Sequence, residues 1–306
     1  MISIPHKAKQ FSLFTIKLLV VIGAFYFIYT QISNKPGLNW TDSKRFILEK
    51  ISNIEFSIII LFSIANRFLE ILKWQNLVES FKKINLYQST EQVLTALTLG
   101  VITPYGVGEY VGKTLYYPKK DAKKIILLNL ICNGIQMILI AFFGIISFFV
   151  LGLYKWGFLL ICIVTLLLFV IFLAGYFKTK LGFIETFITS FSFIPKKIHR
   201  KNILLGTLRF LTLSHQFYFL FVAFDIQIPY LTLIATVSVV YLLANSLPSF
   251  QLFDFAIKGS VAVYFFGLLG INEWLVVFIS TLIWILNIVL PICIGSYFVI
   301  KYKSKS

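Results

Sequence analysis

Two apolar stretches of this 306-residue chain carry the same three kinds of residue in the same order. Each has a proline, then an acid five or six residues later, then a lysine four residues beyond the acid. The residues are Pro104, Glu109 and Lys113 in TPYGVGEYVGK, and Pro248, Asp254 and Lys258 in LPSFQLFDFAIK. An acid and a lysine at this spacing share one helix face and attract each other. Because a lone charge near the centre of a bilayer costs about 2.5–3.5 kcal/mol, each pair predicts either simple neutralisation at an interface or a wet binding cavity.

A second set of polar side chains lies in IANRFLEILKWQNL, at the end of another apolar stretch. Asn66, Glu70, Lys73 and Trp74 form one stripe along a helix. Lys73 and Trp74 are typical of a helix end at the membrane surface, with the lysine extended toward the cytoplasm. Asn66 and its neighbour Arg67 lie one to two turns deeper. The stripe is therefore predicted to face either the interface or a cavity.

Single polar residues also interrupt the later apolar stretches. Gln136 and Gln216 are typical of hydrogen bonds between membrane helices, or of a cavity lining. Arg209 has no acid on its own helix, and its planar guanidinium suits a lipid phosphate. The predicted substrate-binding residues are Glu109, Lys113, Asp254, Lys258, Arg209, Asn66, Glu70, Gln136 and Gln216. No catalytic residue is predicted.

The composition favours a lipid environment for these residues. The chain is 58% hydrophobic and 13% charged, with a mean hydropathy of +0.88, whereas soluble domains carry about 25% charged residues. A formal charge of +16 would indicate nucleic acid in a soluble protein. Membrane proteins, however, collect Lys and Arg in cytoplasmic loops, so no nucleic-acid partner is expected. The Cys and His spacings match no metal site, and neither a metal nor a cofactor is predicted.

The elements that position the charged residues are predicted to be helices. Six segments are long and apolar enough to span a membrane: 11–30, 54–73, 124–150, 157–177, 203–224 and 273–300. Two further apolar regions, 92–117 and 230–270, are interrupted near their middles by proline and charge. The predicted helix-breaking residues are Pro104, Gly106, Gly108 and Pro248. Such broken segments are typical of re-entrant hairpins, so the predicted fold is an all-α polytopic membrane protein with six spans and two hairpins.

The distribution of basic residues orients this topology. Nineteen of the 28 Lys and Arg fall on the side of the N-terminus, five on the other side, and four at membrane depth. This bias predicts an inner (cytoplasmic) membrane protein with both termini in the cytoplasm. The residues form one membrane domain of two pseudo-repeats, about 1–153 and 154–306, each with two spans, a hairpin and a third span. The hairpins then open from opposite sides, as in an inverted-topology repeat.

Three stretches of the sequence resemble a known family. TPYGVGEYVGKTLYY, LPSFQLFDFAIKGSVAVYFFGLLGINE and NRFLEILKW are similar to segments of flippase-like membrane proteins related to the membrane domain of lysylphosphatidylglycerol synthetase. The likeness extends over about 54–295. It departs at two positions, because the family's arginines are replaced by Lys113, displaced by one residue, and by Lys258. The resemblance implies lipid translocation, and both lysines keep a cation but lose the bidentate geometry of arginine.

These observations favour a lipid flippase-like transporter that moves an anionic or glycosylated lipid between leaflets, with membrane lipids as partners and no enzymatic activity. Lys113, Lys258 and Arg209 would contact the headgroup, while Glu109 and Asp254 orient the cations or carry a coupling proton. An alternative is a membrane-embedded transferase that acts on a lipid-linked substrate, with Glu109 or Asp254 as general base. A further alternative is a non-catalytic scaffold for a partner synthase.

Overall fold

The computed structural model describes residues 6–33, 52–103, 106–176, 191, 194–248 and 250–302. Within these ranges the chain forms helices and no strand, which confirms the all-α prediction. The α-helices are α1 (His6–Ser33), α3 (Asn53–Val78), α4 (Leu86–Ile102), α5 (Val107–Gly112), α6 (Ala122–Val150), α7 (Tyr154–Tyr176), α9 (Lys196–Ala223), α10 (Tyr230–Ser246), α11 (Asp254–Leu268), α12 (Glu273–Trp284) and α13 (Leu290–Lys301). Short 3-10 turns are η2 (Lys113–Tyr116), η3 (Lys119–Asp121) and η4 (Gln251–Phe253), and a π-helical turn, η5 (Ile285–Val289), joins α12 to α13.

Two of the helical stretches carry the strongest membrane character. Lys119–Val150 and Glu273–Lys301 are long and apolar enough to cross a membrane, as judged by length and composition over the described residues. All six predicted spans coincide with helices, and crossing by the other four stays a prediction. Among these, α3 and α9 carry charged side chains within otherwise apolar sequence, including Arg67, Glu70 and Arg209.

Local sequence explains where several helices begin. Ser52 and Glu55 form a reciprocal capping box at the start of α3, and Asn85 and Gln88 do the same for α4. Each box satisfies backbone N–H groups that have no partner within the helix. Pro195 immediately precedes α9, where a residue without an N–H group loses no helical hydrogen bond.

The first interrupted region forms a helix, a sharp turn and a short second helix. α4 ends at Ile102, and α5 begins at Val107 after Gly106, which has a left-handed backbone (φ +68°). Pro104 lies outside the described residues. Gly108 allows α5 to fold back on α4, because a Cβ there would lie only 2.1 Å from the Leu99 carbonyl oxygen. The interruption thus rests on two glycines, one for the turn and one for the close approach.

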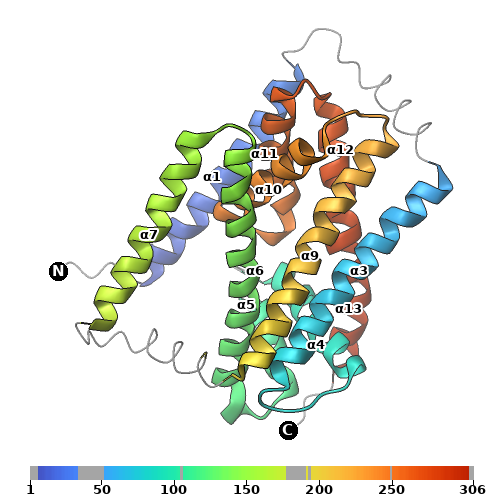
Figure 1. Cartoon of the computed structure of the whole chain (residues 1–306). Coiled ribbons are helices and arrows are strands. Elements are labelled where there is room, and N and C mark those ends of the chain that lie inside the picture. Colours follow the sequence, from blue (N-terminus) through green and yellow to red (C-terminus); the bar gives the residue numbers. More distant parts are fainter. Residues whose placement is uncertain are drawn as a thin grey trace.

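The second interrupted region has the same order of elements. α10 ends at Ser246, exposed Pro248 follows, and the chain passes through η4 into α11 at Asp254. α11 packs against both α10 and α12 and is also covered by α1. Figure 1 shows this hairpin in the upper half of the molecule and the α4–α5 hairpin in the lower half. Helix ends therefore occur at both places where the sequence predicts them.

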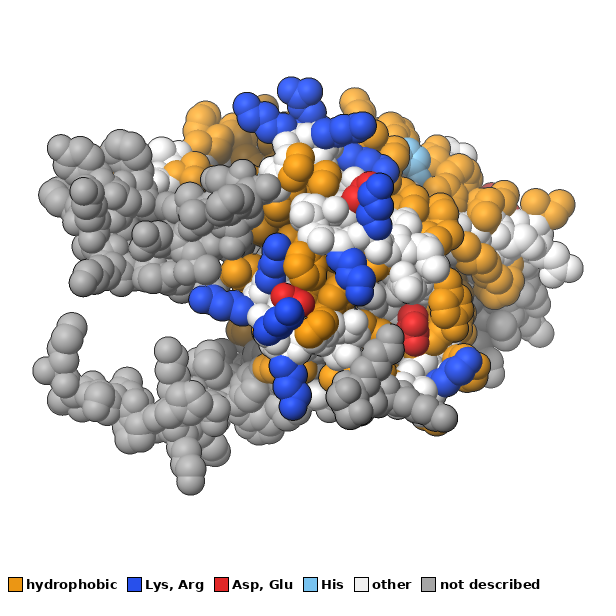
Figure 2. Space-filling model, turned by 90° about the horizontal axis from the view of Figure 1, so that it is seen from below, with side chains coloured by type: hydrophobic (Ala, Val, Ile, Leu, Met, Phe, Trp, Pro, Cys, Tyr) orange, Lys and Arg blue, Asp and Glu red, His pale blue; other side chains and the backbone are white. Residues whose placement is uncertain are grey.

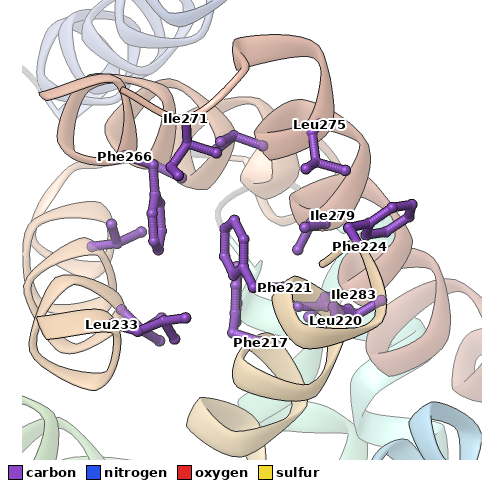
Figure 3. Packing of buried hydrophobic residues seen from close by; sticks show 14 of the residues in the cluster. Phe217, Leu220, Phe221, Phe224, Leu233, Phe266, Ile271, Leu275, Ile279 and Ile283 are labelled. Carbon is purple, nitrogen blue, oxygen red and sulfur yellow. The ribbon is translucent and has the colours of Figure 1, made fainter. Parts of the chain in front are cut away.

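The largest hydrophobic core of the described residues lies between α9, α10, α11 and α12, and five of its eighteen buried residues are aromatic. Phe221 and Phe266 are both fully buried, with ring centroids 4.5 Å apart. Figure 3 shows Phe221 of α9 and Phe266 of α11 facing each other, with Phe217 below Phe221 on α9 and Ile279 of α12 on its other side. A second core joins α3, α4 and α6 around Trp74. These two cores fix the helices that border the charged interior.

The lower end of the molecule in Figure 1 is strongly basic. Here lie the connection after α3, the start of α6 and the start of α9. Seen from this end, Figure 2 shows Lys and Arg side chains gathered over much of the described surface, with few acids among them. The basic residues of these segments are Lys82, Lys83, Lys119, Lys120, Lys123, Lys124, Lys196, Lys197, Arg200 and Lys201.

Candidate functional site

A cavity of about 440 Å³ lies between the helices of both halves of the chain. Its lining is unusually rich in charge for the interior of an apolar helix bundle. Helices α3, α4, α5, α6, α9, α10 and α11, together with η2 and η5, all contribute to it. Its polar and charged lining residues are Arg67, Glu70, Glu109, Tyr110, Lys113, Asn133, Gln136, Arg209, Tyr241, Asn245 and Lys258. We call this space the polar cavity.

Glu70 of α3 joins two arginines at one wall of the polar cavity. Its Oε2 atom accepts a hydrogen bond from Arg67, one turn earlier on α3, and another from Arg209 Nη2 of α9 at 3.2 Å. Arg67 also donates to the backbone carbonyl of Asn287. Arg209 therefore has an acidic partner across the helix interface, although none lies on its own helix.

A chain of amides continues from this ion cluster into the bundle. Arg209 Nε donates to Asn66 Oδ1 at 3.0 Å, and Asn66 donates to Asn287 Oδ1 at 2.7 Å. Asn287 then donates to Gln216 Oε1 at 2.9 Å, and Gln216 to Ser63 Oγ at 2.6 Å. Each side-chain amide thus acts as donor and acceptor, which satisfies its capacity away from water.

The amide chain borders a second, smaller space of about 90 Å³, which we call the inner chamber. Asn66 and Asn287 line the chamber but not the polar cavity. The π-helical turn η5 carries Asn287 and replaces a regular α-turn in the last long helix. Such insertions are frequent at functional sites because they turn one residue out of the helical register. Arg67, Arg209, Leu213, Tyr241, Lys258 and Ile288 line both spaces.

The first hairpin supplies Glu109 and Lys113, but they do not form the predicted ion pair. Glu109 Oε1 accepts from Asn133 Nδ2 at 2.8 Å, whereas Lys113 Nζ donates to Asn129 Oδ1 at 2.6 Å. The prediction assumed a continuous α-helix, yet α5 ends at Gly112 and Lys113 begins a 3-10 turn. Two amides of α6 bind the two side chains separately, Asn133 at Glu109 and Asn129 at Lys113.

The predicted surface position of Lys73 and Trp74 is wrong. Both side chains are buried, with exposed fractions of 1% and 0%. α3 continues to Val78 and is covered by α4, α6 and α9, so these residues lie inside the bundle. Lys73 Nζ donates to Gln136 Oε1 at 2.9 Å and to the Cys132 carbonyl at 3.3 Å.

Trp74 holds the other buried lysine of this region. Lys113 Nζ lies 4.1 Å from the centroid of the Trp74 ring, which is within the range of a cation–π interaction. The indole Nε1 donates to Gln92 Oε1 at 2.7 Å, and Tyr117 donates to the same oxygen at 3.0 Å. This arrangement fixes the ring plane over which the lysine lies.

The second hairpin forms the ion pair that the sequence predicts. Lys258 Nζ lies 2.5 Å from Asp254 Oδ2, one turn earlier on α11. Lys258 also lies over the Tyr241 ring at 5.6 Å and lines the polar cavity. Asp254 does not line the cavity and lies behind Lys258.

Of the nine predicted binding residues, six line the polar cavity: Glu70, Glu109, Lys113, Gln136, Arg209 and Lys258. Asn66 lines the inner chamber, Asp254 lies behind Lys258, and Gln216 is fully buried in the amide chain. The prediction omits Arg67, Tyr110, Asn133, Tyr241 and Asn245. Arg67 could have been predicted, since it lies deep in an apolar stretch three residues before Glu70. The helical spacing that groups Asn66 with Glu70, however, places Arg67 on a neighbouring face of the helix.

No protein-family model matches the chain, and no curated protein matches its sequence. Over the described residues, no group of three or more His, Cys, Asp and Glu is placed to hold a metal ion. The polar cavity offers fixed cations, carboxylates, amides and tyrosine hydroxyls to a ligand. Guanidinium and ammonium groups bind phosphate and carboxylate oxygens, and the amides and tyrosines can bind hydroxyl groups.

Proposed function

We propose that this chain is a multi-pass membrane transporter that moves a lipid with an anionic headgroup between leaflets. The observation that carries the proposal is the polar cavity, in which charged residues from both interrupted regions face one space inside an apolar bundle. Charged residues in membrane helices almost always face the bundle interior or a water-filled cavity, and they mark substrate or ion pathways because a charge is costly in lipid. The headgroup would occupy the polar cavity while the acyl chains remain in the bilayer.

The order and packing of the helices support an inverted repeat. α1, α3, the α4–α5 hairpin and α6 correspond in order to α7, α9, the α10–α11 hairpin and α12–α13. An approximate twofold axis would place α3 against α9, and would relate the contact of α4 with α13 to that of α10 with α6. All three contacts are present. Broken helices at equivalent positions of two such repeats surround the substrate in many secondary transporters.

The basic end of the molecule supports an orientation. Lysines and arginines gather at the end that carries the starts of α6 and α9 (Figure 2). By the positive-inside rule this end would face the cytoplasm, which leaves the α10–α11 hairpin toward the opposite leaflet. The first hairpin would then open from the cytoplasm and the second from outside. Rocking of one repeat against the other would expose the polar cavity to each side in turn.

We propose that the acids hold the cations in position and that the cations, not the acids, bind the lipid headgroup. Asp254 holds Lys258 and Glu70 holds both Arg67 and Arg209, so each carboxylate fixes the position of a cation that lines the cavity. Glu109 is held by Asn133 and faces the cavity directly. The resemblance to flippase-like proteins, which rests on the stretches around these acids, implies lipid translocation.

A lipid-translocation assay tests the proposal. The purified chain is reconstituted in liposomes that contain fluorescent anionic or neutral lipids, and the dye on the outer leaflet is reduced chemically to follow their movement. The wild-type protein is expected to translocate an anionic lipid, and the variants Glu109→Ala and Asp254→Ala are expected to lose this activity while remaining inserted. Glu79→Ala, which removes an exposed acid beyond the end of α3, is the matched control. Wild-type rates in both cavity variants would contradict the proposal.

A further inference from the structure

The polar cavity contains more positive than negative charge. Four cations line it, Arg67, Lys113, Arg209 and Lys258, against the two carboxylates of Glu70 and Glu109. Adding the charged groups directly behind the lining brings in one of each sign, since Lys73 binds Gln136 and Asp254 binds Lys258. The surplus is two positive charges by either count.

Two of these cations have no carboxylate within 4 Å in the described part of the chain. Lys73 is held by an amide oxygen and a backbone carbonyl, and Lys113 by an amide oxygen and an aromatic ring. Both lysines are at least 97% buried. Neutral acceptors orient an ammonium group but do not cancel its charge, so both remain uncompensated in a medium where uncompensated charge is strongly unfavourable.

One donor in the same wall has no partner. Arg67 is about nine-tenths buried, and its Nε atom makes no hydrogen bond within the described part of the chain, although its two terminal nitrogens are both used. The residue borders both the polar cavity and the inner chamber. Orphaned buried donors are rare in folded proteins. The atom is covered by protein and faces neither space, so it leaves one more polar group of this wall without an acceptor.

From the surplus of two charges and the two lysines without a carboxylate partner we infer that the polar cavity binds a terminal phosphate that carries two negative charges, as in a phosphate monoester or a diphosphate. This inference rests on the proposed function, because it names the headgroup that the transporter would carry. A phosphate monoester has a charge of about −1.5 to −2 at pH 7, whereas a phosphodiester has only one negative charge. A monoester therefore neutralises the two surplus positive charges of the cavity, whereas a diester neutralises only one of them.

The spatial arrangement fits a terminal group rather than a bridging one. The cations come from different walls, with Arg67 on α3, Arg209 on α9, Lys258 on α11 and Lys113 on η2. A terminal phosphate presents three oxygen atoms to its surroundings, which several donors can share. A diester presents two, because its other oxygens carry carbon substituents. Arg67 and Arg209, which border both spaces, are placed to bind such a group from the side of the inner chamber.

Binding measurements on the full-length protein test the inference. The purified chain is titrated with dioleoyl phosphatidic acid, a monoester, and with dioleoyl phosphatidylglycerol, a diester with the same acyl chains. We expect phosphatidic acid to bind at least about tenfold more tightly, since one additional charge acts near several fixed cations. Equal affinities for the two lipids would overturn the inference. They would leave the proposed function standing if either lipid is translocated.

Two variants alter the charge surplus in opposite directions. Lys113→Gln lowers the surplus by one charge and is expected to reduce the preference for phosphatidic acid at least about threefold. Glu109→Gln raises the surplus by one charge and is expected to increase the affinity for phosphatidic acid. Damage to the fold would weaken binding in both variants, so opposite shifts cannot arise from instability. Lys83→Gln, which removes an exposed lysine at the basic end, is the control and should change neither affinity. Parallel shifts in the two cavity variants would contradict the inference.

Soluble competitors distinguish the two sources of such a phosphate. Inorganic phosphate and glycerol 3-phosphate are added to the complex with phosphatidic acid. If both compete only at concentrations far above that of the lipid, the ligand is a lipid headgroup. If either competes at similar concentrations, the dianionic site is supported and its ligand is a soluble phosphate. Selective binding of phosphatidic acid without translocation of any lipid would support the site and contradict the proposed function.

Discussion

Removal of the Glu70 charge tests the ion cluster that borders the polar cavity. Glu70→Gln preserves the shape of the side chain but leaves Arg67 and Arg209 without the carboxylate that both contact. Loss of one partner from a buried ion pair costs about 3–5 kcal/mol. Because the three side chains are 10–20% exposed, water in the cavity screens part of this cost, and we expect a loss of about 3 kcal/mol.

The assay is thermal unfolding of the purified protein in detergent, measured by intrinsic fluorescence. Glu79→Gln, an exposed acid at the end of α3, serves as the control and should change stability by less than about 0.5 kcal/mol. The double variant Glu70→Gln with Arg209→Gln should be more stable than the sum of the two single effects predicts, by at least about 1 kcal/mol. If Glu70→Gln unfolds at the same temperature as the wild type, the ion cluster is fully hydrated and its charges are not buried.

Three further experiments test separate parts of the structure in the same unfolding assay. Gly108→Ala should cost about 3 kcal/mol because its Cβ would lie 2.1 Å from a backbone carbonyl oxygen of α4, whereas Gly134→Ala, with open space around its Cβ, should be neutral or stabilising. Similar unfolding temperatures for the two would contradict the packing of the first hairpin. Trp74→Leu should cost about 4 kcal/mol through the lost ring and its contact with a lysine, and Trp74→Phe only about 1–2 kcal/mol, so equal losses would exclude the cation–π contact. A double-mutant cycle on Asp254 and Lys258 should give a coupling of about 0.5–1 kcal/mol, and zero coupling would show that the pair is not formed.

Much of the fold follows from apolar run length and from helix-breaking residues. Lipid-length apolar segments have few alternatives to helix, so the six predicted spans coincide with helices of the structure. The two breaks were also predictable, since proline and charge within an apolar stretch oppose a continuous helix. The role of Gly108 was harder to see, because it depends on how closely α5 folds back onto α4.

The candidate site was predictable as a set of residues but not as a set of contacts. Six predicted residues line one cavity because charges in an apolar bundle must share a polar space. Their pairing depends on helix geometry that the sequence does not reveal. Lys113 lies on a 3-10 turn and binds Asn129 instead of Glu109, while Lys73 is buried because neighbouring helices cover the last turns of α3. The position of either lysine therefore cannot be predicted from the sequence of its own helix alone, because neighbouring helices supply its partners or its cover.

Transport through the polar cavity requires that the cavity be accessible from both sides of the membrane. Single cysteines replace Tyr110 on the first hairpin and Asn245 on the second in a variant without native cysteines, and an impermeant thiol reagent is applied to either face of oriented proteoliposomes. Alternating access predicts that each position is labelled from both sides and that a bound anionic lipid protects both. Labelling from one side alone, unaffected by lipid, would contradict transport through this cavity.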